Sequence, residues 1–370
     1  MEIKTPMNRS FQKWLLPWMR RARDLRKLRN TKVEHVFLCV CDHFEPLHHT
    51  DDRGAIERLQ RWSREYPALA HFRDSDGRGP RHTFFYPIEQ YDARHVEMLA
   101  ALCRATGSEI EVQLHHDGDD EASLRKKLCD GINNLRQHGC LSTDEHGRVT
   151  FGFVHGNWAL CNSRPDGRWC GVANELRVLR DLGCYADFTF PSAPSGTQPR
   201  SVNMLGYARE CGGALALDHL AAATVGSTLR ESAEHLLLVQ GPLALNWRWR
   251  KWGVLPRLEN GDLTKANPPT PQRLRLWIEQ RIHVAGRPEW AFIKVHSHGA
   301  VSANSDVLLG PAAELFHQAF TESFPRESGA QVHYVTAREM ANLVFAAEDD
   351  AGGVPAEFFN HYLRREARGV

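Results

Sequence analysis

The stretch Val36-Phe37-Leu38-Cys39-Val40-Cys41-Asp42-His43-Phe44-Glu45-Pro46 combines a strand signal with a cluster of reactive side chains. Its first six residues are an unbroken apolar run, typical of a strand that is buried on both faces in a parallel sheet. Asp42, His43 and Glu45 follow at once, and a proline then ends the strand. Ligands of α/β proteins bind at the carboxyl ends of such strands, so the sequence predicts a site here.

The same succession of apolar strand, polar residues and helix recurs along the chain. Strands are expected at 36–41, 82–87, 109–114, 149–154, 185–190, 291–295 and 332–335. Helices are expected at 55–70, 92–106, 121–138, 172–182, 271–284 and 337–344. This alternation favours βα units around a parallel sheet or barrel. Residues 193–270 break the pattern and are interpreted as an elaborated rim or lid, and 347–370 as a C-terminal tail.

Residues 1–32 form a basic arm. Between Arg9 and Lys32 there are nine Lys or Arg and one acid, a net charge of +8 in a chain whose total is +1. Apolar residues recur in the arm at helical spacing: Phe11, Trp14, Leu15, Trp18, Met19, Ala22, Leu25 and Leu28. We favour an amphipathic helix that docks on the body and closes the bottom of a barrel, because such stripes are usually part of a core. The alternative is weak contact of residues 9–32 with an anionic membrane surface.

The remaining chain carries a net charge of −7, which argues against a nucleic-acid-binding protein because phosphate contacts need a basic face. The nine cysteines include no Cys-x-x-Cys pair, so the strong zinc-ribbon signal is absent. Free, mostly buried thiols fit a reducing compartment. The sequence shows neither an apolar run of about 18 residues nor a signal peptide. We therefore expect a cytoplasmic protein, with peripheral contact at the inner membrane face through the arm.

Three separated strand ends carry side chains typical of metal sites: Asp42-His43, His115 through Asp119, and His296-Ser297-His298. Carboxylate oxygens and imidazole nitrogens suit zinc or another first-row divalent ion with one position open to water. The four-residue spacing of His115 and Asp119 lets both side chains converge if that segment turns helically. A divalent metal, with zinc as the expected ion, is therefore the predicted cofactor.

The order of these motifs resembles the polysaccharide deacetylase family, the NodB-homology carbohydrate esterases. Asp42-His43 stands where the family has two aspartates, and Thr83-Phe84-Phe85 matches its Thr-Phe-Phe strand. His115 and Asp119 look like the His-x-x-x-His motif with its second histidine replaced, and Val295-His296 is similar to the final motif. The resemblance implies an α/β fold over residues 33–346, a distorted (β/α)7-type barrel to which the arm and the lid are added.

The resemblance also implies residue roles. Asp42 is expected to be the catalytic base and His296 the general acid, and the expected metal ligands are His43, His115 and Asp119. The family's third motif is replaced by His155-Gly156-Asn157-Trp158 and its fourth by Pro191-Ser192, which leaves the substrate open because these motifs contact it. The candidate substrate-binding residues are His155, Asn157, Trp158 and His298.

The predicted function is a metal-dependent hydrolase that removes an N-acyl (acetyl) group from an amino sugar or polysaccharide precursor. A cytoplasmic location favours a sugar precursor or a lipid-linked intermediate, that is, a carbohydrate or glycolipid-precursor substrate. One alternative is a non-catalytic carbohydrate-binding or assembly protein on the same barrel, which the altered third and fourth motifs support. Another is a glycoside hydrolase on a related barrel, which needs paired carboxylates such as Asp42 and Glu45 across a cleft.

Overall fold

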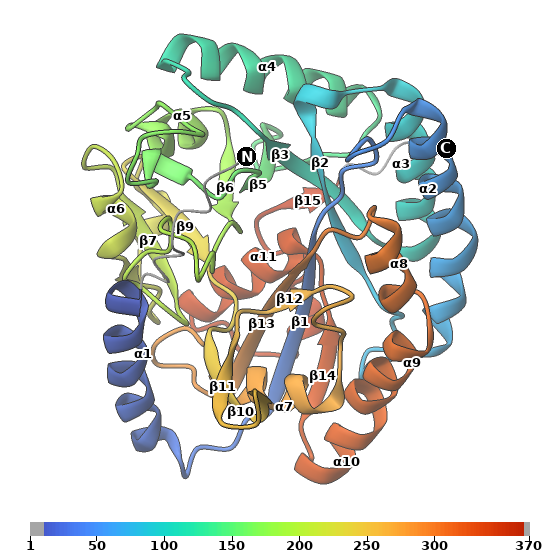
Figure 1. Cartoon of the computed structure of the whole chain (residues 1–370). Helices are drawn as coiled ribbons and strands as arrows, with labels where there is room; N and C mark the ends of the chain where they lie inside the picture. Colours follow the sequence, from blue (N-terminus) through green and yellow to red (C-terminus); the bar gives the residue numbers. More distant parts are fainter. Residues whose placement is uncertain (1–10, 366–370) are drawn as a thin grey trace.

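A mostly parallel β-sheet runs through the computed structural model, which describes residues 11–365, and helices pack around it (Figure 1). Its parallel neighbours are, in order, β13 (Trp290–Ser297), β1 (His35–His43), β2 (His82–Pro87), β3 (Glu109–Leu114), β5 (Val149–His155), β6 (Cys184–Asp187) and β9 (His235–Val239). The other strands of this sheet are β4 (Ser142–Thr143), β7 (Leu205–Arg209), β8 (Ala221–Ala222), β12 (Asp262–Leu263), β14 (Gln331–Tyr334) and β15 (Arg364–Arg365). The structure is therefore of the mixed α/β class, and all the expected strands are present.

Helices follow the strands in the expected alternation. They are α1 (Phe11–Leu25), α2 (Asp52–Glu65), α3 (Ala93–Thr106), α4 (Glu121–Gln137), α5 (Glu175–Asp181), α6 (Leu215–Asp218), α7 (Pro271–Glu279), α8 (Ser302–Leu308), α9 (Pro311–Gln318), α10 (Phe324–Ser328) and α11 (Ala337–Glu348). The side chains of Asp92, Asp120 and Thr336 cap the starts of α3, α4 and α11, where amide groups have no partner inside the helix. Within the described part of the chain, no helix has the length and apolar content needed to cross a membrane.

Strand β1 lies at the centre of the sheet. It pairs in parallel with β13 along most of its length, with β14 over its first half and with β2 over its second half. Its side chains alternate between two cores. Phe37 and Cys39 face a core that includes the fully buried helix α11, whereas Val36 and Leu38 face the core under α2 and α3. Burial of this strand on both faces confirms the prediction from its apolar run.

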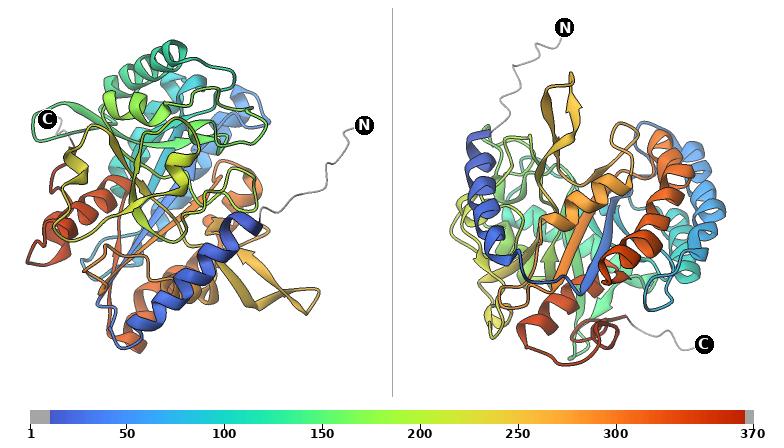
Figure 2. Two further views of the ribbon diagram at one scale, coloured as in Figure 1. Left: turned by 90° about the vertical axis from the view of Figure 1, so that its left-hand side faces the viewer. Right: turned by 90° about the horizontal axis from the view of Figure 1, so that it is seen from below.

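The interval 193–270, interpreted from the sequence as a rim or lid, supplies strands to the sheet itself. β9 pairs in parallel with β6, β7 runs antiparallel beside β9, and β12 pairs in parallel with β13. A hairpin of β10 (Ala244–Lys251) and β11 (Leu255–Glu259) stands out from the body (Figure 2). The strand His235–Val239 escaped the sequence analysis because it is short and its consecutive apolar residues show no alternation.

Both ends of the described chain pack on the body. In α1, Trp14 is completely buried in a small core with Ala193 and Leu243, so the arm docks as its apolar stripe indicated. In the predicted tail, Phe359 and Leu363 are buried, and β15 pairs with β4. The first ten residues of the arm and the last five of the tail lie outside the described residues.

Candidate metal centre and adjoining cavity

The carboxyl end of β1 brings imidazole and carboxylate groups from two neighbouring strands to one place. His43 is the last residue of β1, Glu45 follows it, and His298 follows β13. Parallel pairing of these strands, in which Asp42 stands opposite Ser297, puts their ends side by side. As a result, ligand atoms of His43, Glu45 and His298 all lie within 4.8 Å of one another.

His43 is completely buried, and neither ring nitrogen has a hydrogen-bond partner among the described residues. Its imidazole stacks on the indole of Trp158, and the ring of His298 lies 4.9 Å away between centroids. Burial, together with the nearby imidazoles, lowers the pKa of His43 far below its usual value, so the ring is neutral at pH 7. A buried polar group without a partner is costly, and a neutral imidazole is the form that binds metal ions.

Glu45 supplies the negative charge of this group. Its Oε1 accepts a hydrogen bond from Nε2 of Gln113 at 2.6 Å, and lies 3.3 Å from Nε2 of His115. The same oxygen lies 3.8 Å from Nδ1 of His298, and Oε2 lies 3.1 Å from Nδ1 of His48. Burial opposes ionisation, but the hydrogen bond with His115 and the charge of His298 hold the pKa of Glu45 below its usual value. Glu45 is therefore a carboxylate at pH 7.

The predicted ligand His115 lies beside this group. Its Nε2 faces Glu45, and its Nδ1 lies 2.6 Å from Oε1 of Glu89. Burial lowers the pKa of His115, but the hydrogen bonds to Glu45 and Glu89 outweigh it and raise the pKa to about 9. A carboxylate on the outer nitrogen is the arrangement that orients metal-bound histidines. With a pKa of about 9, His115 is protonated at pH 7, so it could bind a metal next to Glu45 only after losing a proton.

The donor set of these residues fits a metal ion. Two or three imidazoles and one carboxylate suit zinc or another first-row divalent ion. A catalytic zinc has three protein ligands and keeps one position for water. The residues that could hold the ion are His43, Glu45 and His298, with His115 as the additional candidate. The unpartnered nitrogens of His43 are the observation that most favours an ion here.

A cavity of about 320 Å³ adjoins this centre at His298. Its wall includes four of the candidate catalytic and substrate-binding residues predicted from the sequence: Asn157, Trp158, His296 and His298. The other lining residues are Trp169, Pro191, Ser192, Ala193, Pro194, Ser195, Asn260, Asp262, Thr264 and Ser297. The indole of Trp158 meets the ring of His296 nearly edge-on, with centroids 4.9 Å apart. The same indole stacks on the ring of His43, so Trp158 connects the cavity to the centre. The volume lies near the lower end of the range of about 300–1,000 Å³ that is typical of small-ligand pockets.

Asp42 lies on the opposite face of β1 from His43, because successive strand residues point to opposite faces. Its Oδ1 accepts the N–H of Gly299 at 2.6 Å, and its Oδ2 lies 3.7 Å from Nε2 of His82. Asp42 is completely buried outside the cavity wall, and burial raises its pKa to about 7. The base role implied by the family resemblance therefore draws no support from this geometry, since the carboxylate faces away from His43.

Asp119 is not brought together with His43 and His115. Its carboxylate binds Nζ of Lys127 at 2.7 Å, and its Oδ2 lies 3.1 Å from Nδ1 of His116. Convergence of the predicted ligands required a helical turn over this segment. The segment is instead an irregular loop, and α4 begins only after it, so the four-residue spacing does not put the two side chains on one face.

His155 also lies away from the cavity. It is completely buried, and its Nε2 lies 3.9 Å from Oε1 of Glu175. It belongs to a second group with His116, Cys170 and Glu175, whose ligand atoms again lie within 4.8 Å of one another. The cause is the alternation along β5, which turns Val154 toward one core and His155 toward the other face.

Two carboxylates of the centre and cavity were not predicted as metal ligands or as residues of the hydrolase site, although Glu45 was named as a candidate for the glycoside-hydrolase alternative. Glu45 stands two residues after His43, and that position in the opening stretch is a signal that could have identified it. Asp262 lines the cavity and stands opposite His296 in the pairing of β12 with β13. It lies in the interval without regular periodicity, where the sequence offers no comparable signal.

No protein-family model matches the chain, and no curated protein sequence matches it. The geometry of the centre and the cavity is therefore the evidence that bears on function.

Proposed function

We propose that this chain is a metal-dependent hydrolase that removes an N-acyl group from an amino sugar or a related carbohydrate or glycolipid precursor. One observation carries the proposal: the group of His43, Glu45 and His298 borders a cavity through His298. This is the arrangement in which a metal-activated water could reach a bound substrate. The parallel strands and the order of the motifs also support a deacetylase-type (β/α)7 barrel as the fold.

Amide hydrolysis needs a nucleophilic water, stabilisation of the oxyanion and a proton for the departing amine. A divalent ion held by His43, Glu45 and His298 would lower the pKa of water and polarise the carbonyl. We assign protonation of the leaving nitrogen to His296, which lines the cavity. Burial lowers the pKa of His296 well below its usual value, so the ring must first gain a proton released during the reaction before it can donate one. The edge-on contact with Trp158 holds its ring in place.

Asp262 is the carboxylate to which we assign the proton of the attacking water. It lines the cavity and stands opposite His296 in the sheet. Its Oδ2 accepts a hydrogen bond from Nδ2 of Asn267 at 2.8 Å, whereas its Oδ1 is buried without a hydrogen-bond partner among the described residues. That free oxygen is what a proton acceptor needs. For Asp42, the role of catalytic base is implied only by the family resemblance.

A second candidate is a carbohydrate-binding protein without catalysis. Trp158 and Trp169 on the cavity wall favour it, because aromatic walls with a few polar groups are typical of small-ligand sites. A glycoside hydrolase has less support, since Asp42 lies behind β1 and does not face Glu45 across the cavity.

The test measures metal content and hydrolysis on the same full-length samples. Elemental analysis should show that His43→Ala/Glu45→Gln lacks one metal equivalent present in the wild type. Acetate release from N-acetylated amino sugars, free and nucleotide-linked, should fall to background in that variant. The control Glu145→Gln/His146→Ala alters the same residue types at an exposed turn and should keep both properties. Unchanged metal content in the first variant contradicts the centre, and sugar binding by the wild type without acetate release favours the binding protein.

A further inference from the structure

A second group of ligand-type side chains lies under the start of α5, outside the cavity. It consists of His116, His155, Cys170 and Glu175, all buried, and their ligand atoms lie within 4.8 Å of one another. The four residues come from the loop after β3, the end of β5, the loop before α5 and the first residue of α5. Side chains this far apart in the sequence meet only through the tertiary fold.

Glu175 is the point on which the other three converge. Its Oε1 lies 3.1 Å from Nε2 of His116 and 3.9 Å from Nε2 of His155. Its Oε2 lies 3.4 Å from Sγ of Cys170 and accepts the backbone N–H of Cys161 at 2.7 Å. The rings of His116 and His155 are 4.6 Å apart between centroids. Two nitrogens, one sulfur and one oxygen thus surround a single small volume.

Two further observations indicate a ligand in that volume. His155 is completely buried, yet its Nε2 has no hydrogen-bond partner in the described part of the chain. His116 turns Nε2 toward the group, and its outer nitrogen, Nδ1, lies 3.1 Å from Oδ2 of Asp119 without forming a hydrogen bond within the described residues. The Asp119 carboxylate is near enough to accept from Nδ1 after a small rotation, as a carboxylate behind a metal-bound histidine does. A buried ion pair of His116 with Glu175 would explain those two residues, but would leave the inward-facing nitrogen of His155 unexplained.

We propose that His116, His155, Cys170 and Glu175 bind one zinc ion in a closed, structural site. A thiolate beside imidazoles selects zinc over magnesium or calcium, and four protein ligands leave no position for water. A tetrahedral zinc with bonds of about 2.0–2.3 Å separates its ligand atoms by about 3.3–3.8 Å. The observed group meets this spacing after small side-chain movements.

This site would fix the loop between β5 and α5 to the body. That loop supplies Asn157, Trp158 and Trp169 to the cavity wall, and His155 and Cys170 lie next to them in the sequence. Because a structural zinc site contributes its binding energy to folding, the ion would stabilise the wall of the cavity. The inference does not depend on the proposed function, since no ligand of this group is one of the proposed catalytic residues.

The experiment uses full-length protein loaded with Co²⁺ or Zn²⁺. Cobalt-loaded wild type should show a thiolate-to-cobalt charge-transfer band that Cys170→Ala lacks. Cys103→Ala, a buried cysteine in α3, is the matched control and should keep the band. Cys170→Ala and His155→Ala should each lose one zinc equivalent, including in the His43→Ala/Glu45→Gln background, and should melt at a lower temperature.

X-ray absorption of the zinc-loaded wild type requires no variant and should reveal a sulfur neighbour. A metal environment of nitrogen and oxygen alone overturns the proposal, as does an unchanged cobalt band in Cys170→Ala. Failure of the proposed catalytic centre would leave these results unaffected, so the two ideas can be judged separately.

The hairpin of β10 and β11 stands out from the body (Figure 2). Its apolar residues Trp247, Trp252, Val254 and Leu255 are each more than half exposed, and Trp252 reaches 76%. Large apolar groups gathered on a projecting element mark an interaction surface. The hairpin therefore presents a surface for a partner.

The charge of this surface indicates the chemistry of the partner. The segment 244–258 contains Arg248, Arg250, Lys251 and Arg257 and no acidic residue. Nζ of Lys251 lies 4.4 Å from the centre of the Trp252 ring, so a cation and an indole share the tip. Tryptophan together with Lys and Arg is typical of protein surfaces that lie in the headgroup region of anionic membranes.

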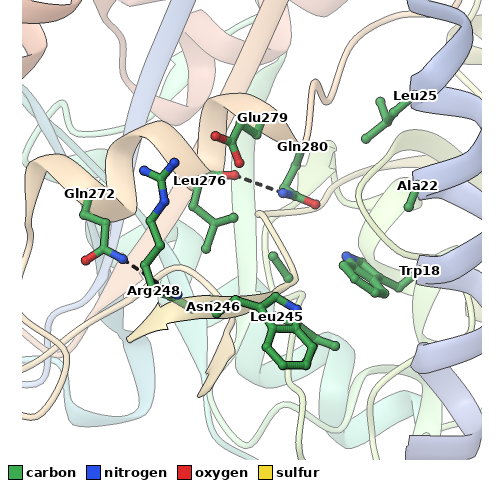
Figure 3. A pocket seen from close by; sticks show the side chains of 12 residues that line it. Trp18, Ala22, Leu25, Leu245, Asn246, Arg248, Gln272, Leu276, Glu279 and Gln280 are labelled. Carbon is green, nitrogen blue, oxygen red and sulfur yellow. Dashed lines mark hydrogen bonds between the residues drawn. The ribbon is translucent and has the colours of Figure 1, made fainter. Parts of the chain in front are cut away.

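Helix α1 also carries exposed apolar and basic residues, separate from the hairpin. Leu16 and Met19 are more than half exposed on it, and Arg20 and Arg23 are exposed beside them. Between α1, β10 and α7 lies a pocket of about 320 Å³, and Figure 3 shows Trp18 and the α1 residues next to it facing this space.

We propose that the β10–β11 hairpin docks on an anionic membrane surface. Full-length protein should co-sediment with vesicles that contain phosphatidylglycerol and much less with pure phosphatidylcholine vesicles. Trp252→Ser/Val254→Ser should reduce sedimentation several-fold, whereas Leu315→Ser, at an exposed apolar position of α9, should not. Equal sedimentation of all three proteins overturns the proposal. So does binding that depends only on Arg248, Arg250 and Lys251, which would indicate a soluble polyanion as the partner.

Discussion

The imidazole of His43 lies against the indole of Trp158, with ring centroids 4.9 Å apart and ring planes inclined by 14°. Trp158 also holds a positive φ of 61°, which is rare for a bulky residue and fixes the direction of its side chain. One indole therefore supports the candidate metal ligand on one side and the cavity on the other. Metal binding and substrate binding should be coupled through this ring.

Trp158→Ala should weaken binding of zinc at the centre. Aromatic pairs contribute about 0.5–1.5 kcal/mol, so we expect the affinity to fall by about 2- to 10-fold. The same variant should raise KM for the proposed amino-sugar substrate, because the cavity loses part of its wall. Competition with a chromophoric chelator measures the affinity. Trp158→Phe keeps an aromatic ring and should lose less, and an equal loss in both variants would contradict the stacking argument.

His296→Ala and Asp262→Asn should retain the metal and lose activity. General acid–base groups contribute about 10²–10⁴-fold each, and both residues line the cavity without belonging to the ligand group. Asp42→Asn is the informative comparison. The carboxylate of Asp42 points to the face of β1 opposite His43, so this variant should keep most of the activity. Rates and metal content measured together decide the roles. A large loss of activity in Asp42→Asn with intact metal would give the base role back to Asp42.

More of the fold than of the site could be predicted from the sequence. The apolar run at Val36 predicted a doubly buried strand, because burial on both faces leaves a local pattern that needs no knowledge of neighbours. The projecting hairpin and strand β9 left no such pattern, since their pairing partners are far along the chain. Short strands depend on tertiary pairing more than on their own residues.

For the site, the sequence located the strand ends but not the direction of each side chain. His43 and His298 meet at the predicted edge, whereas Asp42 points to the other face of its strand. His155 turned away for the same reason, because a shift by one residue along a strand reverses the face. Asp119 depended on the conformation of a loop, and spacing alone cannot determine how a loop turns.

Arg273→Met should destabilise the base of the β10–β11 hairpin strongly. The guanidinium of Arg273 holds Glu259 through two hydrogen bonds of 2.7 and 2.8 Å, and both residues are almost completely buried. Removing one partner of such a pair costs about 3–5 kcal/mol, because it leaves a buried charge. Urea unfolding measures the loss. Arg209→Met breaks the exposed pair with Glu234 and should cost less than about 1 kcal/mol, so equal losses would contradict the role of burial.

The last prediction concerns pH and Glu111. This side chain is completely enclosed by the fold, and its two oxygens accept hydrogen bonds from Tyr185 Oη at 2.7 Å and from the N–H of Gly152 at 2.6 Å. Burial is the main cause that raises the pKa of Glu111 to about 8. The folded protein therefore binds this proton more tightly than the unfolded chain, whose glutamate titrates near 4.5. The stability that Glu111 contributes is complete below pH 4.5 and is lost as pH rises toward 8.

Glu111→Gln should therefore become increasingly more stable than the wild type between pH 5 and pH 8, by at most about 1.4 kcal/mol per pH unit. Glutamine can still accept from Gly152 and donate to Tyr185, so the contacts are preserved while the ionisable group is removed. Glu109 on the same strand provides the control. Burial favours the protonated form of Glu109, but the charge of Arg338 outweighs burial and holds the pKa of Glu109 below its usual value. Glu109→Gln should therefore be less stable than the wild type at pH 7. Urea unfolding of the three proteins across this pH range measures both differences, and a pH-independent difference for Glu111→Gln would show that Glu111 stays ionised in the fold.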